Sequence, residues 1–390
     1  MLVTPSSADR AGSPPLNLLT LNEPLARQFV GGLGWPVYRA TQLLRWLYRE
    51  RGRELDRLTN FSKTDRALLQ RKTRLTRFAL DGAVFRSADG TRKFLFDLSE
   101  GLTVESILIP DGQRLTLCLS TQVGCTLNCG FCLTGRMGLK RNLAAHEIVD
   151  QVLTVMDRLG PDERLTNLVL MGMGEPLANF DAVADAITRL THPTWGAGLT
   201  PRRITVSTAG LAARLQDAID LGVNLAVSLN APTDSLRREL MPAASRLASL
   251  PDLLAACRAL TMADRDRLTF EYVLLAGVND REEQAAQVAT LLRDIRCKLN
   301  LIPFNEFPDT PYRRPDQTTI HRFQQRLRQA GYDVLVRRSR GQDVLGACGQ
   351  LGNGPPDAPT PALTPARRLV TNQRRRSARS PGSRPTNAQS

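Results

Sequence analysis

From residue 115 onward the chain alternates between strand-like and helix-like segments, and this alternation constrains the fold more than any other feature. Short runs rich in Val, Ile and Leu indicate strands, and the stretches between them carry apolar residues at helical spacing. The six expected strands are residues 115–121, 167–172, 203–208, 224–229, 268–275 and 298–304. The expected helices are residues 144–160, 211–221, 251–261, 281–294 and 316–330. Strands joined by helices pair in parallel, so the sequence predicts an α/β fold with a partial (β/α)6 barrel.

The rest of the chain divides into segments of different composition. Residues 21–80 predict a helical accessory domain that either decorates the core or contacts RNA, because arginines lie between its apolar positions. These arginines are Arg39, Arg45, Arg49, Arg51 and Arg53. Residues 81–114 alternate around an Asp-Gly turn and predict a β-hairpin and strand extension. Residues 1–20 predict a disordered leader, residues 115–352 the barrel with a C-terminal cysteine loop, and residues 353–390 a disordered Arg/Pro-rich tail.

The charge of the chain bears on its partners. The formal net charge is +14, of which residues 356–390 contribute seven arginines against one aspartate. Such an excess indicates either a solubilising surface or a polyanionic partner such as nucleic acid. The basic tail either adds nonspecific RNA affinity or is a solvated appendage. No apolar stretch is long enough for a membrane span and the first residues do not resemble a secretion signal, so we expect a cytoplasmic protein without membrane contact.

Three of the seven cysteines, Cys125, Cys129 and Cys132, lie within eight residues. Three thiolates on one short loop suit three irons of a cubane cluster and leave the fourth iron open to a substrate. Structural zinc usually takes four ligands, and no fourth Cys or His lies nearby in the sequence. The pattern therefore predicts a [4Fe–4S] cluster, with zinc or a bare electron-transfer cluster as the alternatives.

Polar residues follow the C-terminal ends of the expected strands, which form the active face of a parallel β/α barrel. After the second strand, Gly174 permits close backbone approach and Glu175 can accept hydrogen bonds from an ammonium or from ribose hydroxyls. Ser207, Ser228 and Asn305 end or follow other strands and offer neutral hydrogen bonds. Each alone is ordinary loop chemistry, but their common position favours a site for a zwitterionic nucleoside.

Two further cysteines and one carboxylate are candidates for chemistry. Cys118 shares the more polar face of the first strand with Thr116 and Ser120; its alternative is a small buried core residue. Cys348 lies in the glycine-flanked sequence GACG, on a loop that can bring a thiol into a site, although a structural cysteine is the alternative. Glu105 lies on a semi-buried strand, where it is either a general base or a solvent-facing residue.

Two motifs resemble a known superfamily. The segment CTLNCGFC resembles the signature of the radical S-adenosylmethionine enzymes, and MGMGEP resembles their motif for the methionine amino group. From about residue 21 to residue 352 the chain resembles the RlmN family, through VESILIP, TVSTAG, LAVSLNAP, the LIPFN segment and RGQDVLGACGQLG. The resemblance implies a radical S-adenosylmethionine partial barrel behind an N-terminal RNA-binding domain. It implies methylation of adenosine at C2 in 23S rRNA, at the peptidyl-transferase centre, and in tRNA, next to the anticodon.

The resemblance also assigns roles to residues. It implies that Cys348 carries the methyl group as a thioether, that Cys118 resolves the protein–RNA adduct through a transient disulfide, and that Glu105 accepts a proton. Two S-adenosylmethionine molecules are used per turnover: one methylates Cys348, and the other yields a 5′-deoxyadenosyl radical. The positions that match cofactor-binding residues are Gly174, Glu175, Ser207, Ser228, Leu229, Asn230 and Asn305. Asn230 departs from the histidine of many members, but both side chains form hydrogen bonds.

Two other functions compete with this interpretation. A sister activity methylates C8 of the same ribosomal adenosine with the same cysteines. A non-catalytic iron–sulfur RNA-binding protein would need the cluster but neither extra thiol. The expected partners are 23S rRNA, tRNA and an electron donor such as a flavodoxin or ferredoxin system, and we expect a monomer.

Overall fold

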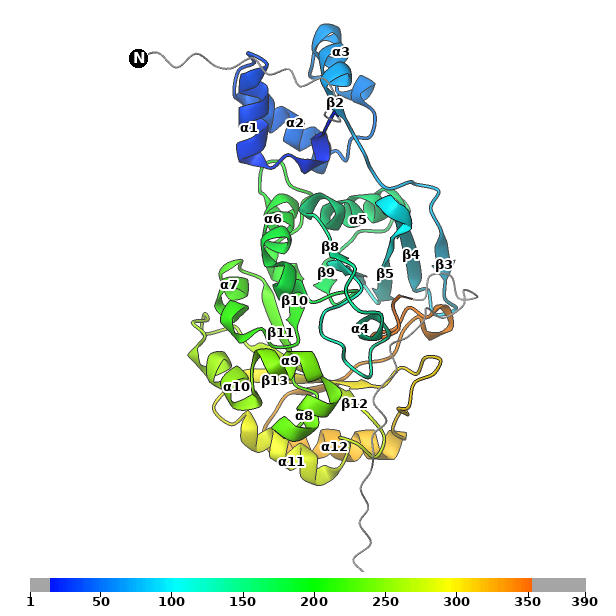
Figure 1. Cartoon of the computed structure of the whole chain (residues 1–390), viewed down its shortest axis with the longest axis vertical. Helices are drawn as coiled ribbons and strands as arrows, with labels where there is room; N and C mark the ends of the chain where they lie inside the picture. Colours follow the sequence, from blue (N-terminus) through cyan, green and yellow to red (C-terminus); the bar gives the residue numbers. More distant parts are fainter. Residues whose placement is uncertain (1–14, 353–390) are drawn as a thin grey trace, which may run out of the picture.

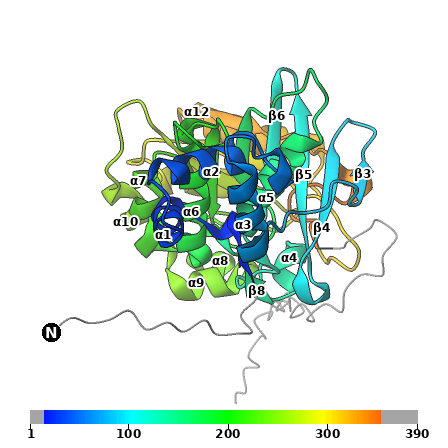
Figure 2. The same ribbon diagram turned by 90° about the horizontal axis from the view of Figure 1, so that it is seen from above.

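The computed structural model describes residues 15–352, and the predicted tail at 353–390 lies outside them. A helical module stands at one end of the molecule, above a long curved sheet with helices along its outer side (Figure 1). Seen from above, the module overlies α5 (Ala145–Asp157) and α6 (Phe180–Thr191), the two helices that cover the nearest part of the sheet (Figure 2). None of the helices within the described range has the length and apolar character that crossing a membrane requires.

The helical module begins earlier than the sequence predicts. Its helices are α1 (Glu23–Gly32), α2 (Tyr38–Tyr48), η2 (Leu55–Arg57) and α3 (Lys63–Lys72). Before them, β1 (Leu16–Asn17) pairs in parallel with β2 (Thr73–Arg74), and η1 (Leu18–Thr20) follows directly. Leu18 and Leu19 are fully buried, and the Leu19 carbonyl accepts hydrogen bonds from Tyr48 and Arg189. The prediction of a disordered leader is therefore wrong for residues 15–20, because packing against α2 and α6 orders them; residues 1–14 lie outside the described range.

One ten-stranded sheet runs through the rest of the described chain, in the order β14-β13-β12-β11-β10-β9-β6-β5-β4-β3. Every neighbouring pair from β14 to β6 is parallel, and the pairs from β6 to β3 are antiparallel. The strands are β3 (Val84–Arg86), β4 (Arg92–Asp97), β5 (Thr103–Asp111), β6 (Arg114–Cys118), β9 (Asn167–Leu170), β10 (Ile204–Thr208), β11 (Asn224–Ser228), β12 (Leu268–Leu274), β13 (Cys297–Pro303) and β14 (Val334–Val336). A separate pair joins β7 (Gln122–Val123) to β8 (Arg141–Asn142).

Helices follow the parallel strands and cover the outside of the barrel. After α5 and α6 they are α7 (Leu215–Asp220), α8 (Asp234–Leu240), α9 (Pro242–Leu247), α10 (Leu250–Ala259), α11 (Glu282–Leu291) and α12 (Gln317–Gln329). The short α4 (Leu133–Arg136) ends the cysteine loop, and single 3-10 turns occur at η3 (Ser99–Gly101), η4 (Pro176–Asn179), η5 (Pro201–Arg203), η6 (Ala212–Arg214) and η7 (Gln342–Val344). The six predicted parallel strands and the partial barrel are confirmed. A seventh parallel strand, β14, adds to them.

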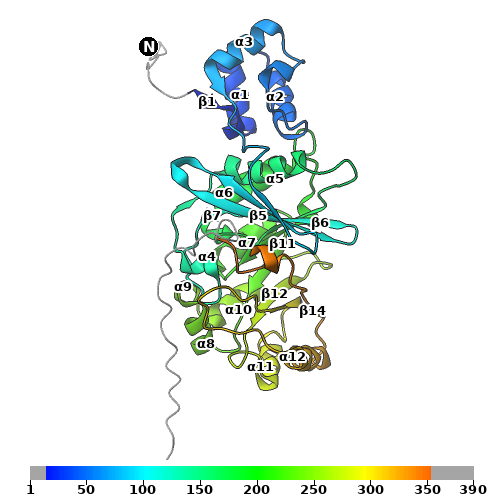
Figure 3. The same cartoon turned by 90° about the vertical axis from the view of Figure 1, so that its right-hand side faces the viewer.

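The predicted hairpin extension is not a separate unit. The β3–β4 hairpin and β5 continue the barrel sheet, because the second half of β5 pairs with β6 and the first half with β4. In the side view, β5 and β6 separate α5 and α6 from the segment that carries Cys348 (orange in Figure 3). The extension therefore forms one wall beside the Cys348 segment.

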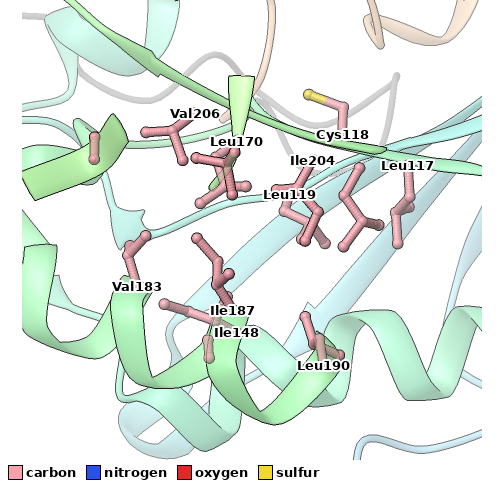
Figure 4. Packing of buried hydrophobic residues seen from close by; sticks show 14 of the residues in the cluster. Leu117, Cys118, Leu119, Ile148, Leu170, Val183, Ile187, Leu190, Ile204 and Val206 are labelled. Carbon is pink, nitrogen blue, oxygen red and sulfur yellow. The ribbon is translucent and has the colours of Figure 1, made fainter. Parts of the chain in front are cut away.

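The two faces of the sheet differ in chemistry. Leu117 and Leu119 point toward apolar residues of α5 and α6, whereas the sulfur of Cys118 points to the opposite side of the strand (Figure 4). Leu117 and Leu119 belong to the main hydrophobic core, which also includes Ile148 of α5 and Ile187 of α6. The alternation of the strand thus places Cys118 on the inner face of the barrel, as its polar neighbours in the sequence predict.

Arginines of the helical module attach it to the barrel. Arg51 and Arg53 bind the Asp157 carboxylate of α5 at 2.7 and 2.9 Å. Arg49 donates to the backbone carbonyls of Pro193 and Gly196, just after α6. Three of the arginines that the sequence offers for RNA contact are therefore engaged within the protein.

Candidate active site

The register of the parallel strands determines which side chains line the barrel interior. Cys118 pairs with Val169 on the next strand. Further around the barrel Ser228 pairs with Glu271, and Glu271 pairs with Asn300. Residues paired in this way point to the same side of a sheet. The inner face therefore carries polar groups, unlike the apolar outer face under the helices.

An open cavity lies at the C-terminal ends of the parallel strands. The cavity lining brings together most of the predicted site residues, which come from loops far apart in the sequence. They are Cys125, Cys129, Cys132, Gly174, Glu175, Ser207, Ser228, Asn230, Asn305 and Cys348. Leu229, Cys118 and Glu105 are buried beside the cavity and do not line it.

The three-cysteine loop is enclosed by apolar side chains. Cys125 and Cys129 belong to a second hydrophobic cluster, separate from the main core, that also contains Phe131, Phe304 and Tyr312. Burial raises the pKa of the Cys125 thiol to about 12, and burial together with the neighbouring thiols raises that of Cys129. Iron ligation would offset this cost of ionising a buried thiol, because metal coordination deprotonates a thiol. The donor set and its dry surroundings fit a thiolate-ligated iron–sulfur cluster.

A single metal ion requires a closer arrangement of its ligands than a cluster does. Within residues 15–352, no group of three or more His, Cys, Asp or Glu side chains is gathered closely enough to hold one ion. A zinc ion binds each thiolate at about 2.3 Å, so its ligands must converge on one point. In a cubane cluster each thiolate ligates a different iron, and its ligands stand around a larger body.

Glu175 and Gly174 form a tight turn against the loop that follows β6. The Glu175 carboxylate accepts hydrogen bonds from the backbone N–H groups of Ala209 (2.7 Å) and Leu177 (3.0 Å). Burial raises the pKa of Glu175 to about 7 in spite of these two donors. Gly174 has φ +104°, and a Cβ there would lie 2.6 Å from Cβ of Gln122. The sequence therefore needs glycine at 174 for both conformation and space.

Asn230 and Asn305 use their amides for contacts within the protein. Asn230 has φ +57°, and its Oδ1 accepts a hydrogen bond from the Val273 backbone N–H at 2.8 Å. Asn305 donates from Nδ2 to the Cys348 carbonyl at 3.0 Å and accepts from Gln342 Nε2 at 3.1 Å. Asn305 thus connects the end of β13 to the Cys348 loop, a role that the sequence does not predict.

The loop that carries Cys348 is anchored at both ends. Before the cysteine, the backbone N–H of Gly341 donates to Asp89 Oδ2 in the β3–β4 turn at 2.9 Å. After it, Gln350 Nε2 donates to the Glu306 carbonyl at 2.6 Å, and the Gly349 carbonyl accepts from Leu133 of the cysteine loop at 2.8 Å. These contacts hold a glycine-rich segment in one position over the barrel.

The two extra cysteines differ in their exposure. Both are free thiols; Cys118 is buried and Cys348 is exposed to the cavity. Burial raises the pKa of Cys118 to about 12, and negative charge on Cys348 adds to this rise. Partial enclosure raises the pKa of Cys348 to about 11. The buried Arg337 guanidinium opposes both shifts, because a nearby cation favours each thiolate.

Glu105 is buried on β5, with a side chain that is only 1% exposed. Its carboxylate pairs with Lys93 Nζ of β4 at 3.1 Å and accepts a hydrogen bond from the backbone N–H of Gly352 at 3.0 Å. Gly352 closes the Cys348 loop, so Glu105 holds that loop to the sheet. The solvent-facing alternative for Glu105 is wrong.

Sequence reasoning missed three polar residues of the barrel interior. Glu271 lines the cavity, and Asn300 donates a hydrogen bond to the Glu271 carboxylate. Arg337 donates from Nη1 to Met171 Sδ at 3.5 Å. The alternation of LTFEYVL on β12 could have placed Glu271 inside the barrel. No comparable signal exists for Arg337, which follows the three-residue β14.

Comparisons with known proteins agree with this geometry. A family model for the radical SAM superfamily matches residues 119–289, and one for the ribosomal RNA large subunit methyltransferase N-terminal domain matches residues 16–75. The chain is 46% identical to the dual-specificity RNA methyltransferase RlmN of Desulfosudis oleivorans, over 80% of this chain and 84% of that protein. It is 43% identical to the RlmN of Bdellovibrio bacteriovorus, over 86% of this chain and 84% of that protein. A radical SAM methyltransferase from Sphaerobacter thermophilus superposes with a TM-score of 0.81 and 41% identity, over 86% of this chain and 99% of that one.

Proposed function

The chain belongs to the RlmN family of radical S-adenosylmethionine RNA methyltransferases, and from that premise we propose how its residues methylate C2 of adenosine in 23S rRNA and tRNA. The observation that carries the proposal is the shared cavity, which joins the three-cysteine loop, the strand-end polar residues and Cys348. The relatives from Desulfosudis oleivorans and Bdellovibrio bacteriovorus are both dual-specificity RlmN enzymes, and this favours C2 over the C8 alternative. A non-catalytic iron–sulfur protein would have no use for a fourth thiol, Cys348, that faces this cavity.

Cys125, Cys129 and Cys132 would hold a [4Fe–4S] cluster, which supplies, together with S-adenosylmethionine, the one-electron chemistry that activates a methyl group. Glu175, which lines the cavity, would accept a hydrogen bond from the cofactor ammonium. Ser207 and Ser228 face the same cavity with neutral hydroxyls that suit ribose. The aromatic and aliphatic shell around the cysteine loop excludes water from the reacting groups.

Cys348 is proposed as the methyl carrier, because its thiol is accessible from the cavity and its loop is anchored to the β3–β4 turn, the loop after β13 and the start of α4. After the methyl carbon has joined adenine C2, the Cys118 thiolate attacks the Cys348 sulfur. An S–S bond forms as the S–C bond to the RNA breaks, and the electron pair of the broken bond leaves with the methylene carbon, which takes up a proton to become the methyl group. A two-electron reductant then restores both thiols. The Arg337 cation supports this step by favouring ionised Cys118.

Glu105 is proposed as the acceptor of the proton that leaves C2. Its carboxylate pairs with the Lys93 ammonium, and its bond to Gly352 keeps it beside the Cys348 loop. Substituting Glu105 by Gln should lower RNA methylation while methylation of Cys348 itself persists. Equal loss of both would place the role of Glu105 in the fold rather than in proton transfer.

The N-terminal module is proposed to bind RNA through α3 and the end of β2, since its docking arginines are already engaged. Lys63, Arg71, Lys72 and Arg74 are all exposed there. We further propose that the enzyme works as a monomer in the cytoplasm, where both RNAs are found. Its reductant would be a one-electron donor of the flavodoxin or ferredoxin class.

The proposed function is tested with the reconstituted full chain under anaerobic conditions. Wild-type protein, S-adenosylmethionine, a reductant and a ribosomal RNA fragment should give 2-methyladenosine. The Cys348→Ala variant should give none, because the methyl group has no carrier. Methylation by that variant would overturn the carrier role, and 8-methyladenosine from the wild type would move the chain to the sister activity.

A further inference from the structure

Glu271 places a carboxylate inside the barrel, next to the cofactor positions. It pairs across the sheet with Ser228, the last residue of β11, and its side chain lines the cavity. The residue is only 4% exposed. Glu271 Oε1 accepts a hydrogen bond from Asn300 Nδ2 at 2.9 Å. Its other oxygen, Oε2, is buried and receives no hydrogen bond from any residue between 15 and 352.

A buried acceptor without a donor is costly, so its persistence in a cavity wall indicates a ligand that supplies the donor. Asn300 Oδ1 is in the same condition within the described range. A carboxylate that lines the cavity and has one oxygen without a donor suits an amino group, which carries N–H donors. The ammonium of S-adenosylmethionine already has Glu175 at the strand ends, whereas Glu271 lies three residues before the end of β12.

We propose, on the basis of the function above, that Glu271, held in place by Asn300, accepts a hydrogen bond from the exocyclic N6 amine of the target adenine. The amine and C2 flank N1 on the same edge of the ring. Fixing the amine therefore determines where C2 points. Glu271 and Cys348 both line the same cavity. The base must leave its RNA stack to reach this position, as for other enzymes that modify bases.

This arrangement selects adenosine over related bases. Purine riboside lacks the amine, and its binding would leave Oε2 without a donor. Inosine places its O6 acceptor against the carboxylate, and two acceptors repel. A glutamine at 271 can turn its amide to donate to O6, so the substitution Glu271→Gln should change the preference rather than only weaken binding.

The test is a cycle between residue 271 and the target base. RNA fragments carry adenosine, purine riboside or inosine at the target position, and 2-methylated product is measured by mass spectrometry. The ratio of adenosine to purine riboside methylation should be at least tenfold higher in the wild type than in Glu271→Ala. A tenfold ratio is about the effect of one buried hydrogen bond. Glu271→Gln should raise the ratio of inosine to adenosine methylation by about tenfold or more. Glu283→Gln, on the exposed start of α11, is the matched control and should behave as wild type.

A second readout separates base recognition from folding and cofactor binding. Methylation of Cys348 needs no RNA and is measured on the intact protein by mass spectrometry. It should proceed in Glu271→Gln at the wild-type rate. Loss of Cys348 methylation in that variant would overturn the inference and give Glu271 to the cofactor. Equal base preferences in wild type and Glu271→Ala would also overturn it, whereas a wild type that methylates no adenosine would refute the proposed function itself.

Discussion

Replacing Asp150 by Ala should destabilise the protein more than any other single change at the junction of the helical module and the barrel. The side chains of Asp150 and Arg77 are each only 4% exposed and form an ion pair. Asp150 also accepts hydrogen bonds from the Phe78 backbone (2.5 Å) and from Thr154 (3.1 Å). Removing one partner of a buried pair costs about 3–5 kcal/mol, because the remaining charge is left buried. Arg77 keeps Asp157 at 3.2 Å as a second acceptor, so we expect about 3 kcal/mol.

That loss corresponds to a fall in Tm of roughly 6–12 °C, at about 2–4 °C per kcal/mol. Thermal unfolding of the reduced chain, followed by circular dichroism, measures it. Asp157→Ala is the matched control: its carboxylate is more exposed and its arginine partners Arg51 and Arg53 are partly solvated, so we expect about 1–2 kcal/mol. An Asp150→Ala protein as stable as Asp157→Ala would refute the reasoning. On heating, Asp150→Ala should lose RNA methylation before it loses methylation of Cys348, because the substitution displaces the helical module and leaves the barrel in place.

Three further predictions follow from the site. Cys118→Ala should accumulate a covalent protein–RNA adduct, visible as an RNA-linked band on a denaturing gel; free methylated RNA at the wild-type rate would contradict the resolving role. Gly174→Ala should abolish cofactor binding through its clash with Gln122, whereas Gly198→Ala, with positive φ but open space, should cost only about 1 kcal/mol of stability. Hydrogen bonds from Thr91 and Gly341 lower the pKa of Asp89 to about 2, against the effect of burial. Because folding lowers that pKa, the ionised carboxylate stabilises the folded state. The difference in Tm between wild type and Asp89→Asn should be full above about pH 4 and vanish as the pH falls toward 2. A difference in Tm that does not change with pH would contradict the role of Asp89 as an anchor of the Cys348 loop.

The barrel could be predicted from the sequence because its signals are local. Alternation and helical spacing mark each strand and helix within a few residues, and a parallel sheet then follows from their order. β14 escaped this reasoning, since three residues are too few to show a period. Residues 15–20 escaped it for a different reason. They are ordered by contacts with Tyr48 and Arg189, which lie far along the chain.

The site could be predicted in part, and its limits are those of long-range geometry. The cysteine spacing is local, and the polar residues at the strand ends meet because parallel strands share one active face. The arginines of the module illustrate the limit. A basic helical face has the same sequence whether it meets a phosphate or Asp157, and only the fold shows that Arg51 and Arg53 take the second option. Glu271 and Arg337 likewise gain meaning only once the strands around them are in place.

The fate of a labelled methyl group tests the central claim most directly. The reconstituted full chain is given S-adenosylmethionine with three deuterium atoms on its methyl carbon, together with the RNA fragment, and the modified nucleoside is analysed by mass spectrometry. Transfer through a Cys348 thioether requires the loss of one deuterium before the carbon joins the base. The account therefore predicts 2-methyladenosine with two deuterium atoms in its methyl group. A methyl group that retains all three, or one attached at C8, would contradict it.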